Sequence, residues 1–154
     1  MNTPSTDHAL DPADERRIAV GLFNHVWTLM ETTDRTAEQT DEMIHAAHAS
    51  RYHWGNVGER VHQARGEWQV SRVYSVLGRG EPALWHARRC LEICQEHGID
   101  DWDLAFAYEA MARANRVAGD LPGRDRYLAE ARAAGAAIKA DEDRQLLEAD
   151  LATV

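Results

Sequence analysis

The sequence predicts an all-α protein of stacked antiparallel helical hairpins, with six main helices and a short C-terminal helix that caps them. Alanine, glutamate, arginine and leucine are abundant among the 154 residues, and runs of Val, Ile and Thr that would favour strands are absent. Glycines recur where segments of helical apolar periodicity end. The length suits one domain, which we expect at residues 12–154 after a disordered lead-in at residues 1–11.

Capping residues and helix breakers set the boundaries of the expected helices. Asp11 followed by Pro12 is an N-cap with proline at the first helical position, and Thr36 with Gln39 forms a capping box. Gly55 and Gly58 are expected to end the second helix. We therefore expect helices at about residues 13–31, 37–53, 59–77, 82–97, 101–118, 122–140 and 141–152.

The first helix carries two apolar stripes, which predicts two packing partners. One stripe suits the core of the protein, and the second could contact another helix or another subunit. A structural homodimer joined through this second stripe is therefore one alternative function; the stripe consists of Phe23, Trp27 and Met30. At the other end of the chain, the short last helix is expected to cover the remaining open face with Leu146, Leu147 and Leu151.

An internal repeat is the main sign of organisation, because residues 67–90 align with residues 108–131 at an offset of 41. Each copy has a helix, a glycine, a short turn and a second helix. The first copy has large and small residues in the order Val70, Ser71, Tyr74, Gly78, Ala83, Ala87 and Cys90. The second copy keeps Tyr108, Met111, Ala112, Gly119 and Ala131, but has Asn115 and Arg124 at two other packing positions.

In these residues the chain resembles the tetratricopeptide (TPR) repeat family, over roughly residues 65–131. The offset exceeds the usual repeat of about 34 residues, so the resemblance is to a variant with longer helices. It implies a right-handed array of helical hairpins that acts as a protein–protein interaction module, with the leading helices lining a concave face. An ordinary antiparallel helical bundle is the alternative architecture.

Arginine and aromatic residues share the face of the leading helices that would line this concave surface. They are spaced helically along the third and fifth helices, and comprise Arg65, Trp68, Arg72, Phe106, Glu109, Arg113 and Arg116. Guanidinium groups bind carboxylate or phosphate in pairs of hydrogen bonds, and a neighbouring Trp or Phe adds stacking. We therefore expect an acidic peptide segment or a small anion to bind here. Alternatively, Glu109 pairs with Arg113 and the other arginines are a solvated face.

Histidine and cysteine residues suggest a second function, metal binding, with or without metal-dependent enzyme activity. His86, Cys90 and Cys94 form one stripe on the fourth helix, and imidazole with thiolate suits zinc or copper. A further ligand would come from His48 or His53 on the second helix. The Glu-x-x-His pattern at residues 42–45 and 59–62 occurs in di-iron bundles, but here the two copies lie close in sequence. Alternatively, the stripe packs in the core and Cys90 is a small buried residue.

Charge and missing motifs exclude several other classes. The formal net charge of −9 argues against non-specific nucleic-acid binding. No signal peptide is predicted, and residues 18–30, the longest apolar stretch, are too few to span a bilayer, so a cytoplasmic location without membrane contact is expected. The sequence lacks a phosphate-binding loop, a nucleophile elbow and a His-Glu-x-x-His motif, which argues against an enzyme. The main hypothesis needs no cofactor; zinc, copper or iron belongs to the metal alternative.

Overall fold

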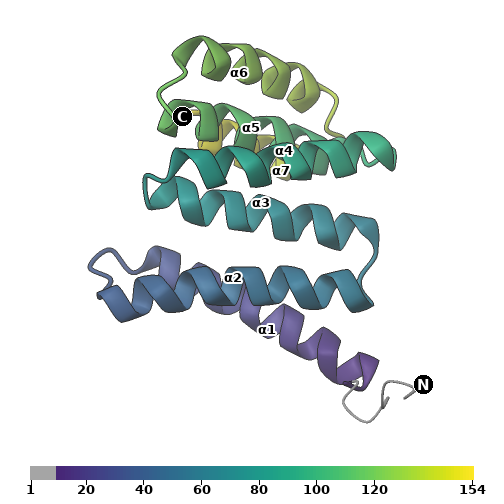
Figure 1. Ribbon diagram of the computed structural model, residues 1–154. Helices are drawn as coiled ribbons and strands as arrows, with labels where there is room; N and C mark the ends of the chain where they lie inside the picture. The colour runs from purple at the N-terminus through teal and green to yellow at the C-terminus, as the bar shows by residue number, and fades with distance from the viewer. Residues whose placement is uncertain (1–9) are drawn as a thin grey trace, which may run out of the picture.

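The computed structural model describes residues 10–154, and within them the chain forms seven helices and no strand (Figure 1). This confirms the all-α prediction. The helices are α1 (Pro12–Glu31), α2 (Ala37–Val57), α3 (Arg60–Val76), α4 (Gly80–Glu96), α5 (Asp101–Val117), α6 (Leu121–Ala136) and α7 (Asp141–Leu151). Most of the predicted lead-in at residues 1–11 lies outside the described residues.

Consecutive helices pack against each other to form a helical array. Three hairpins, α1 with α2, α3 with α4 and α5 with α6, stack in chain order, and α3 also contacts α5. The helix α7 departs from this order, because it packs back against α5 and α6 on one side of the array (Figure 1). We call the side formed by α1, α3 and α5 and partly covered by α7 the inner face.

Local signals in the sequence account for most of the helix ends. Asp11 Oδ1 accepts the N–H of Ala13 at 2.9 Å, and the capping box of Thr36 and Gln39 is formed in both directions. The glycines at equivalent positions of the two repeat copies both adopt a left-handed backbone, with φ of 71° at Gly78 and 84° at Gly119. The repeat in the sequence therefore corresponds to a repeated helix ending.

Two helix ends differ from the prediction. The helix α2 continues past Gly55 to Val57, because Trp54 is buried and stacks on His62 with ring centroids 4.5 Å apart. The helix α6 ends at Ala136 rather than near residue 140. There the chain turns so that Ile138 is buried against α7, and its N–H donates to the carbonyl of Gly135 in a tightened last turn.

The short last helix covers the array as expected, although with two of its three leucines. Leu147 and Leu151 are buried in a cluster with Ala105, Ala131 and Ile138. Leu146 is 62% exposed and points instead to the inner face. Within residues 10–154, none of the helices combines the length and the apolar character needed to cross a bilayer.

Candidate functional site

Arg65, the first of the four predicted binding arginines, is engaged within the chain. Its Nε and Nη2 donate to the two carboxylate oxygens of Asp103 at 2.9 and 3.0 Å, a bidentate pair between α3 and α5. The hydrogen bonds that the guanidinium donates to Asp103 raise its pKa further above the ordinary value. The same guanidinium lies 4.4 Å from the centre of the Trp102 ring, in a cation–π contact.

The other three arginines form a network that includes α7. Arg113 donates to Glu109 at 2.6 Å, and Arg72 donates to the same Glu109 oxygen at 3.2 Å and to Asp150 at 3.4 Å. Arg113 also donates to the backbone carbonyl of Asp150 at 3.0 Å, and Arg116 to the carbonyl of Thr153 at 2.7 Å. The arginines at this end of the inner face therefore hold the last segment of the chain.

Glu109, at the centre of this network, has no exposed surface. Burial raises the pKa of its carboxyl above the ordinary value, while the charges of Arg113 and Arg72 oppose that shift. Its second oxygen, Oε2, has no hydrogen-bond partner within the described residues, and neither have the nearby Trp68 Nε1 and Ser75 Oγ. The pairing of Glu109 with Arg113 agrees with the alternative stated for this face, but Arg72 and Arg113 are packed rather than solvated, and among the arginines of this network only Arg116 is exposed.

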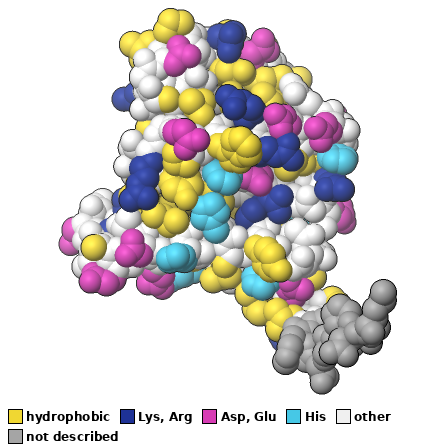
Figure 2. All heavy atoms as spheres, in the orientation of Figure 1, with side chains coloured by type: hydrophobic (Ala, Val, Ile, Leu, Met, Phe, Trp, Pro, Cys, Tyr) yellow, Lys and Arg dark blue, Asp and Glu magenta, His cyan; other side chains and the backbone are white. Residues whose placement is uncertain are grey.

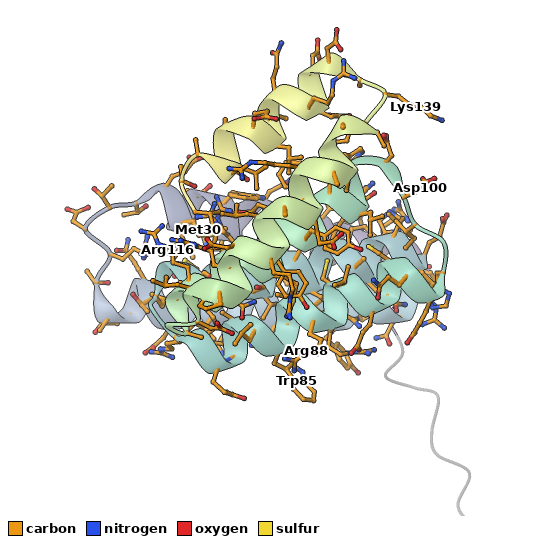
Figure 3. All side chains as sticks on the ribbon, turned by 90° about the horizontal axis from the view of Figure 1, so that it is seen from above. Met30, Trp85, Arg88, Asp100, Arg116 and Lys139 are labelled. Atoms are coloured by element: carbon orange, nitrogen blue, oxygen red, sulfur yellow. The ribbon has the colours of Figure 1, made fainter. Side chains whose placement is uncertain are left out.

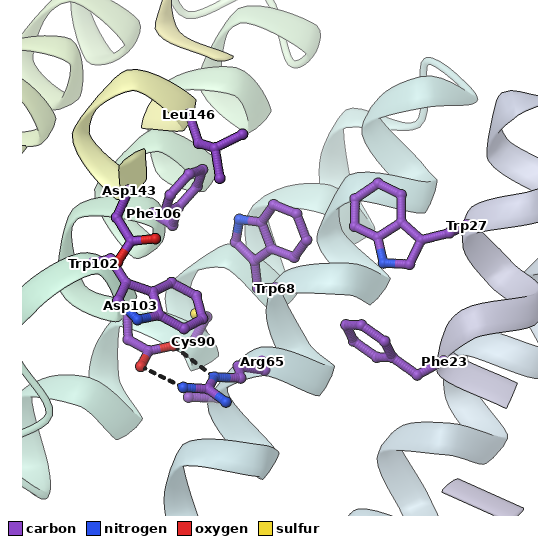
Figure 4. Close-up of a pocket in the computed structure, with 11 residues that line it drawn as sticks. Phe23, Trp27, Arg65, Trp68, Cys90, Trp102, Asp103, Phe106, Asp143 and Leu146 are labelled. Atoms are coloured by element: carbon purple, nitrogen blue, oxygen red, sulfur yellow. Dashed lines mark hydrogen bonds and ion pairs between the residues drawn. The ribbon is translucent and has the colours of Figure 1, made fainter. Parts of the chain in front are cut away.

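A cavity of about 400 Å³ lies beside this network on the inner face (Figure 4). Five half-buried aromatic side chains from three helices wall it: Phe23 and Trp27 of α1, Trp68 of α3, and Trp102 and Phe106 of α5. We call this cavity the aromatic pocket. Ring centroids along the wall are 6.5 Å apart for Phe23 and Trp27, 5.6 Å for Trp27 and Trp68, and 6.1 Å for Trp68 and Phe106. The rings contact one another mostly edge to face, an arrangement that aromatic pairs favour.

The aromatic pocket opens between α1 and α7, which do not contact each other. Leu146 and Asp143 of α7 form the wall opposite α1, and the Arg65–Asp103 pair lies at the bottom of the view in Figure 4. Asp143 is half-buried and has neither an ion pair nor a hydrogen bond from its side chain among the described residues. The lining therefore combines a large apolar surface with one carboxylate that has no ion-pair partner among the described residues.

The predicted metal ligands are divided between separate places. His53 Nδ1 bonds to Glu15 at 2.9 Å, between α1 and α2, while His86 Nδ1 donates to Glu67 at 2.6 Å. Cys90 is buried at the back of the aromatic pocket, and its interaction with Cys94 together with burial raises the pKa of its thiol well above the ordinary value. In residues 10–154 no group of three or more His, Cys, Asp or Glu side chains has the geometry to hold a metal ion. Binding of zinc, copper or iron stays a prediction, which elemental analysis of untagged protein tests.

Two of those histidines do lie close together, on the face opposite α7. The rings of His48 and His86 are 5.3 Å apart, and His48 Nε2 is 2.8 Å from the hydroxyl of Tyr74. Burial would raise the pKa of Glu67, but the bonds from His86 and Arg51 outweigh it and lower the value. Figure 2 shows histidine side chains gathered over the middle of this face, and in Figure 3 Trp85 and Arg88 project from it, away from α7.

The residues of the second apolar stripe of α1 lie in two different surroundings. Phe23 and Trp27 line the aromatic pocket, whereas Met30 packs against the core cluster around Val26 and Val70. The stripe therefore has an intramolecular partner along part of its length. A homodimer through Phe23, Trp27 and Met30 stays a prediction, which light scattering tests.

Four residues of the site were not predicted from the sequence: Trp102, Asp103, Asp143 and Asp150. Asp103 could have been found, because it lies three residues before Phe106 and therefore shares its helical face. Asp150 and Asp143 had no local signal, since their position depends on α7 folding back onto α5. No family model matches this sequence, and comparisons with curated proteins and with solved structures find no match either.

Proposed function

We propose that the chain is a helical-repeat interaction module that receives an apolar group of a partner protein in the aromatic pocket. One observation carries the proposal: a cavity of about 400 Å³ walled by five aromatic side chains, open between two helices that do not touch. Partly exposed Trp and Phe side chains around a cavity are typical of ligand-binding sites and of the central anchor residues of protein interfaces.

The repeat supports the same function, because each hairpin contributes its leading helix to one face. This is the arrangement that the resemblance to TPR repeats implies, and the paired glycines Gly78 and Gly119 are consistent with it. The inner face also holds a helix already: α7 inserts its buried leucines between α5 and α6 and places Asp150 beside Arg72. The protein's own α7 thus illustrates how a helical segment packs on this face.

An acidic peptide or small anion on the arginines is the alternative ligand. Such a ligand would compete with Asp150 for Arg72 and with the carbonyls of Asp150 and Thr153 for Arg113 and Arg116. The aromatic pocket is free of that competition, so we place the primary contact there.

Titration with 2-phenylethanol, followed through the five tryptophan indole N–H signals by NMR, tests the proposal. A probe of this size is expected to bind in the millimolar range. The signals of the pocket residues Trp27, Trp68 and Trp102 should move, while those of the buried Trp54 and the outward-facing Trp85 stay in place. If the pocket signals do not move, or if all five move alike, the proposal is wrong.

A matched pair of variants locates the probe. Leu146→Ser removes an exposed apolar wall of the pocket, and we expect it to weaken binding about two- to fivefold. Leu121→Ser makes the same change at a residue of similar exposure that lies on α6, away from the pocket, and should leave the affinity unaltered.

A further inference from the structure

Charge pairing on the inner face indicates which partner chemistry the aromatic pocket favours. Arg65, the one cation that residues 10–154 contribute to the lining, is already bonded to both oxygens of Asp103. The neighbouring Arg72 and Arg113 are bonded to Glu109 and to residues of α7. An anionic partner group would therefore have to break existing ion pairs, and leaving a buried charge such as that of Glu109 without its partner is costly.

A cationic partner group would meet acidic side chains at the pocket instead of paired arginines. Asp143 lines the pocket from the first turn of α7 and has no ion-pair partner among the described residues, and its neighbour Glu142 adds another acidic group on the exposed side of the helix. The helix α7 has five acidic residues and one arginine, and that arginine is paired with Asp141. Negative charge therefore lies along the wall of the pocket opening, and the chain as a whole is acidic.

The aromatic wall adds a second attraction for a cation. Two guanidinium groups of the protein already lie against these rings, Arg65 at 4.4 Å from the centre of Trp102 and Arg72 at 5.8 Å from that of Trp68. The faces of Trp and Phe rings attract cations through their quadrupole. Phe23, Trp27 and Phe106 have no such cation contact within residues 10–154, although each ring contacts a neighbouring ring of the wall.

From these observations we infer that the partner presents a lysine or arginine beside an aromatic or branched apolar side chain, with the apolar group in the aromatic pocket and the cation at Asp143. The inference rests on the proposed function, and it reverses the charge expected from the arginines in the sequence. A basic, amphipathic segment of another protein has this chemistry.

Three probes with the same phenyl ring and two-carbon spacer test the sign of the charge: 2-phenylethylammonium, 2-phenylethanol and 3-phenylpropionate. Affinities come from the indole signals of Trp27, Trp68 and Trp102, at an ionic strength of about 0.01 M, where surface charges are weakly screened. We expect the ammonium to bind about three- to tenfold more tightly than the alcohol, and the carboxylate least tightly. The preference should shrink at about 0.15 M salt.

Two variants of α7 separate the pocket from the general acidity of the helix. Asp143→Asn should bring the ratio of ammonium to alcohol affinity close to one. Glu142→Gln removes the same charge from the adjacent exposed residue outside the pocket lining, and should keep most of the preference. The unmoved signals of Trp54 and Trp85 show that each variant has the native fold.

Each remaining outcome identifies which proposal fails. Equal or tighter binding of the alcohol overturns the cationic partner but leaves the pocket as an apolar binding site. If the carboxylate binds most tightly, the cationic partner is wrong and an acidic partner segment is favoured. A preference for the ammonium that survives in Asp143→Asn also overturns the inference, because the attraction then lies elsewhere. If none of the probes moves the pocket indoles, the proposed function itself is wrong.

Discussion

Individual arginines of the inner face act as structural cations, since each has a partner within the chain. The clearest case is Arg113, which bonds Glu109, the Asp150 carbonyl and the Thr153 hydroxyl. Arg116 lies one turn away and bonds the Thr153 carbonyl. The two side chains therefore offer a comparison between a half-buried and an exposed arginine on one helix.

Arg113→Ala is expected to lower the free energy of unfolding by about 2–4 kcal/mol, because it leaves the fully buried Glu109 with only the longer contact to Arg72. Arg116→Ala, at an exposed side chain with one backbone contact, should lower it by less than about 1 kcal/mol. Urea unfolding monitored by circular dichroism measures both. Equal losses in the two variants would show that Glu109 does not depend on Arg113.

A histidine of the opposite face gives a prediction for pH. Burial, followed by the charge of His86, lowers the pKa of His48 below its ordinary value of 6.5. The folded state therefore binds fewer protons at this site than the unfolded state does. The resulting stability is complete above pH 6.5 and is lost as the pH falls through the lower pKa of the folded state.

We expect His48→Gln, whose amide can still bond the Tyr74 hydroxyl, to reduce the fall in unfolding free energy between pH 7.5 and 5.5. The change should be about 0.5 kcal/mol, because the half-buried ring is partly screened by solvent. His97→Gln, at an exposed end of α4, is the matched control and should not alter the pH dependence. An unchanged pH dependence in His48→Gln would refute this assignment.

At the scale of elements, the sequence predicted all seven helices, because caps, glycines and apolar periodicity are local signals. Thr36 with Gln39 and the repeated Gly78 and Gly119 all acted where expected. The predicted helix ends were wrong where a tertiary contact sets the end of the helix. The stacking of Trp54 on His62 extends α2, and the burial of Ile138 in the core shortens α6. The sequence predicted that the last helix covers the array and that Glu109 could pair with Arg113, but it did not predict Asp103 and Asp150 as partners of Arg65 and Arg72.

Two glycines in helices test how closely these elements pack. At Gly80, a Cβ atom would lie 2.6 Å from the Ala118 Cα, so Gly80→Ala must separate α4 from the end of α5 and should destabilise by about 1–3 kcal/mol. At Gly21, within α1, nothing lies within 4 Å of the added atom. Gly21→Ala should therefore stabilise the protein by about 0.5–1 kcal/mol through helix propensity, as read from thermal unfolding. If both substitutions stabilised the protein, or both destabilised it, the packing inferred at these two glycines would be wrong.

At the scale of the whole molecule, three hairpins contribute their leading helices to one face, and α7 occupies only part of it. The positive charges of Arg65, Arg72 and Arg113 on that face are paired with Asp103, Glu109 and Asp150, whereas the aromatic surface of the pocket is left uncovered. The sequence predicted three of the side chains that line the pocket, Arg65, Trp68 and Phe106, on a candidate face. It could not predict their charge balance, which depends on contacts between residues up to 78 positions apart.

Selection from a random peptide display library on the immobilised protein shows which side chains the aromatic pocket binds. We expect enriched peptides with an aromatic or branched apolar residue near a lysine or arginine. These peptides should bind Leu146→Ser more weakly than Leu121→Ser and should shift the indole signals of Trp27, Trp68 and Trp102. Enrichment of acidic peptides, or of peptides whose binding does not respond to Leu146, would contradict this prediction.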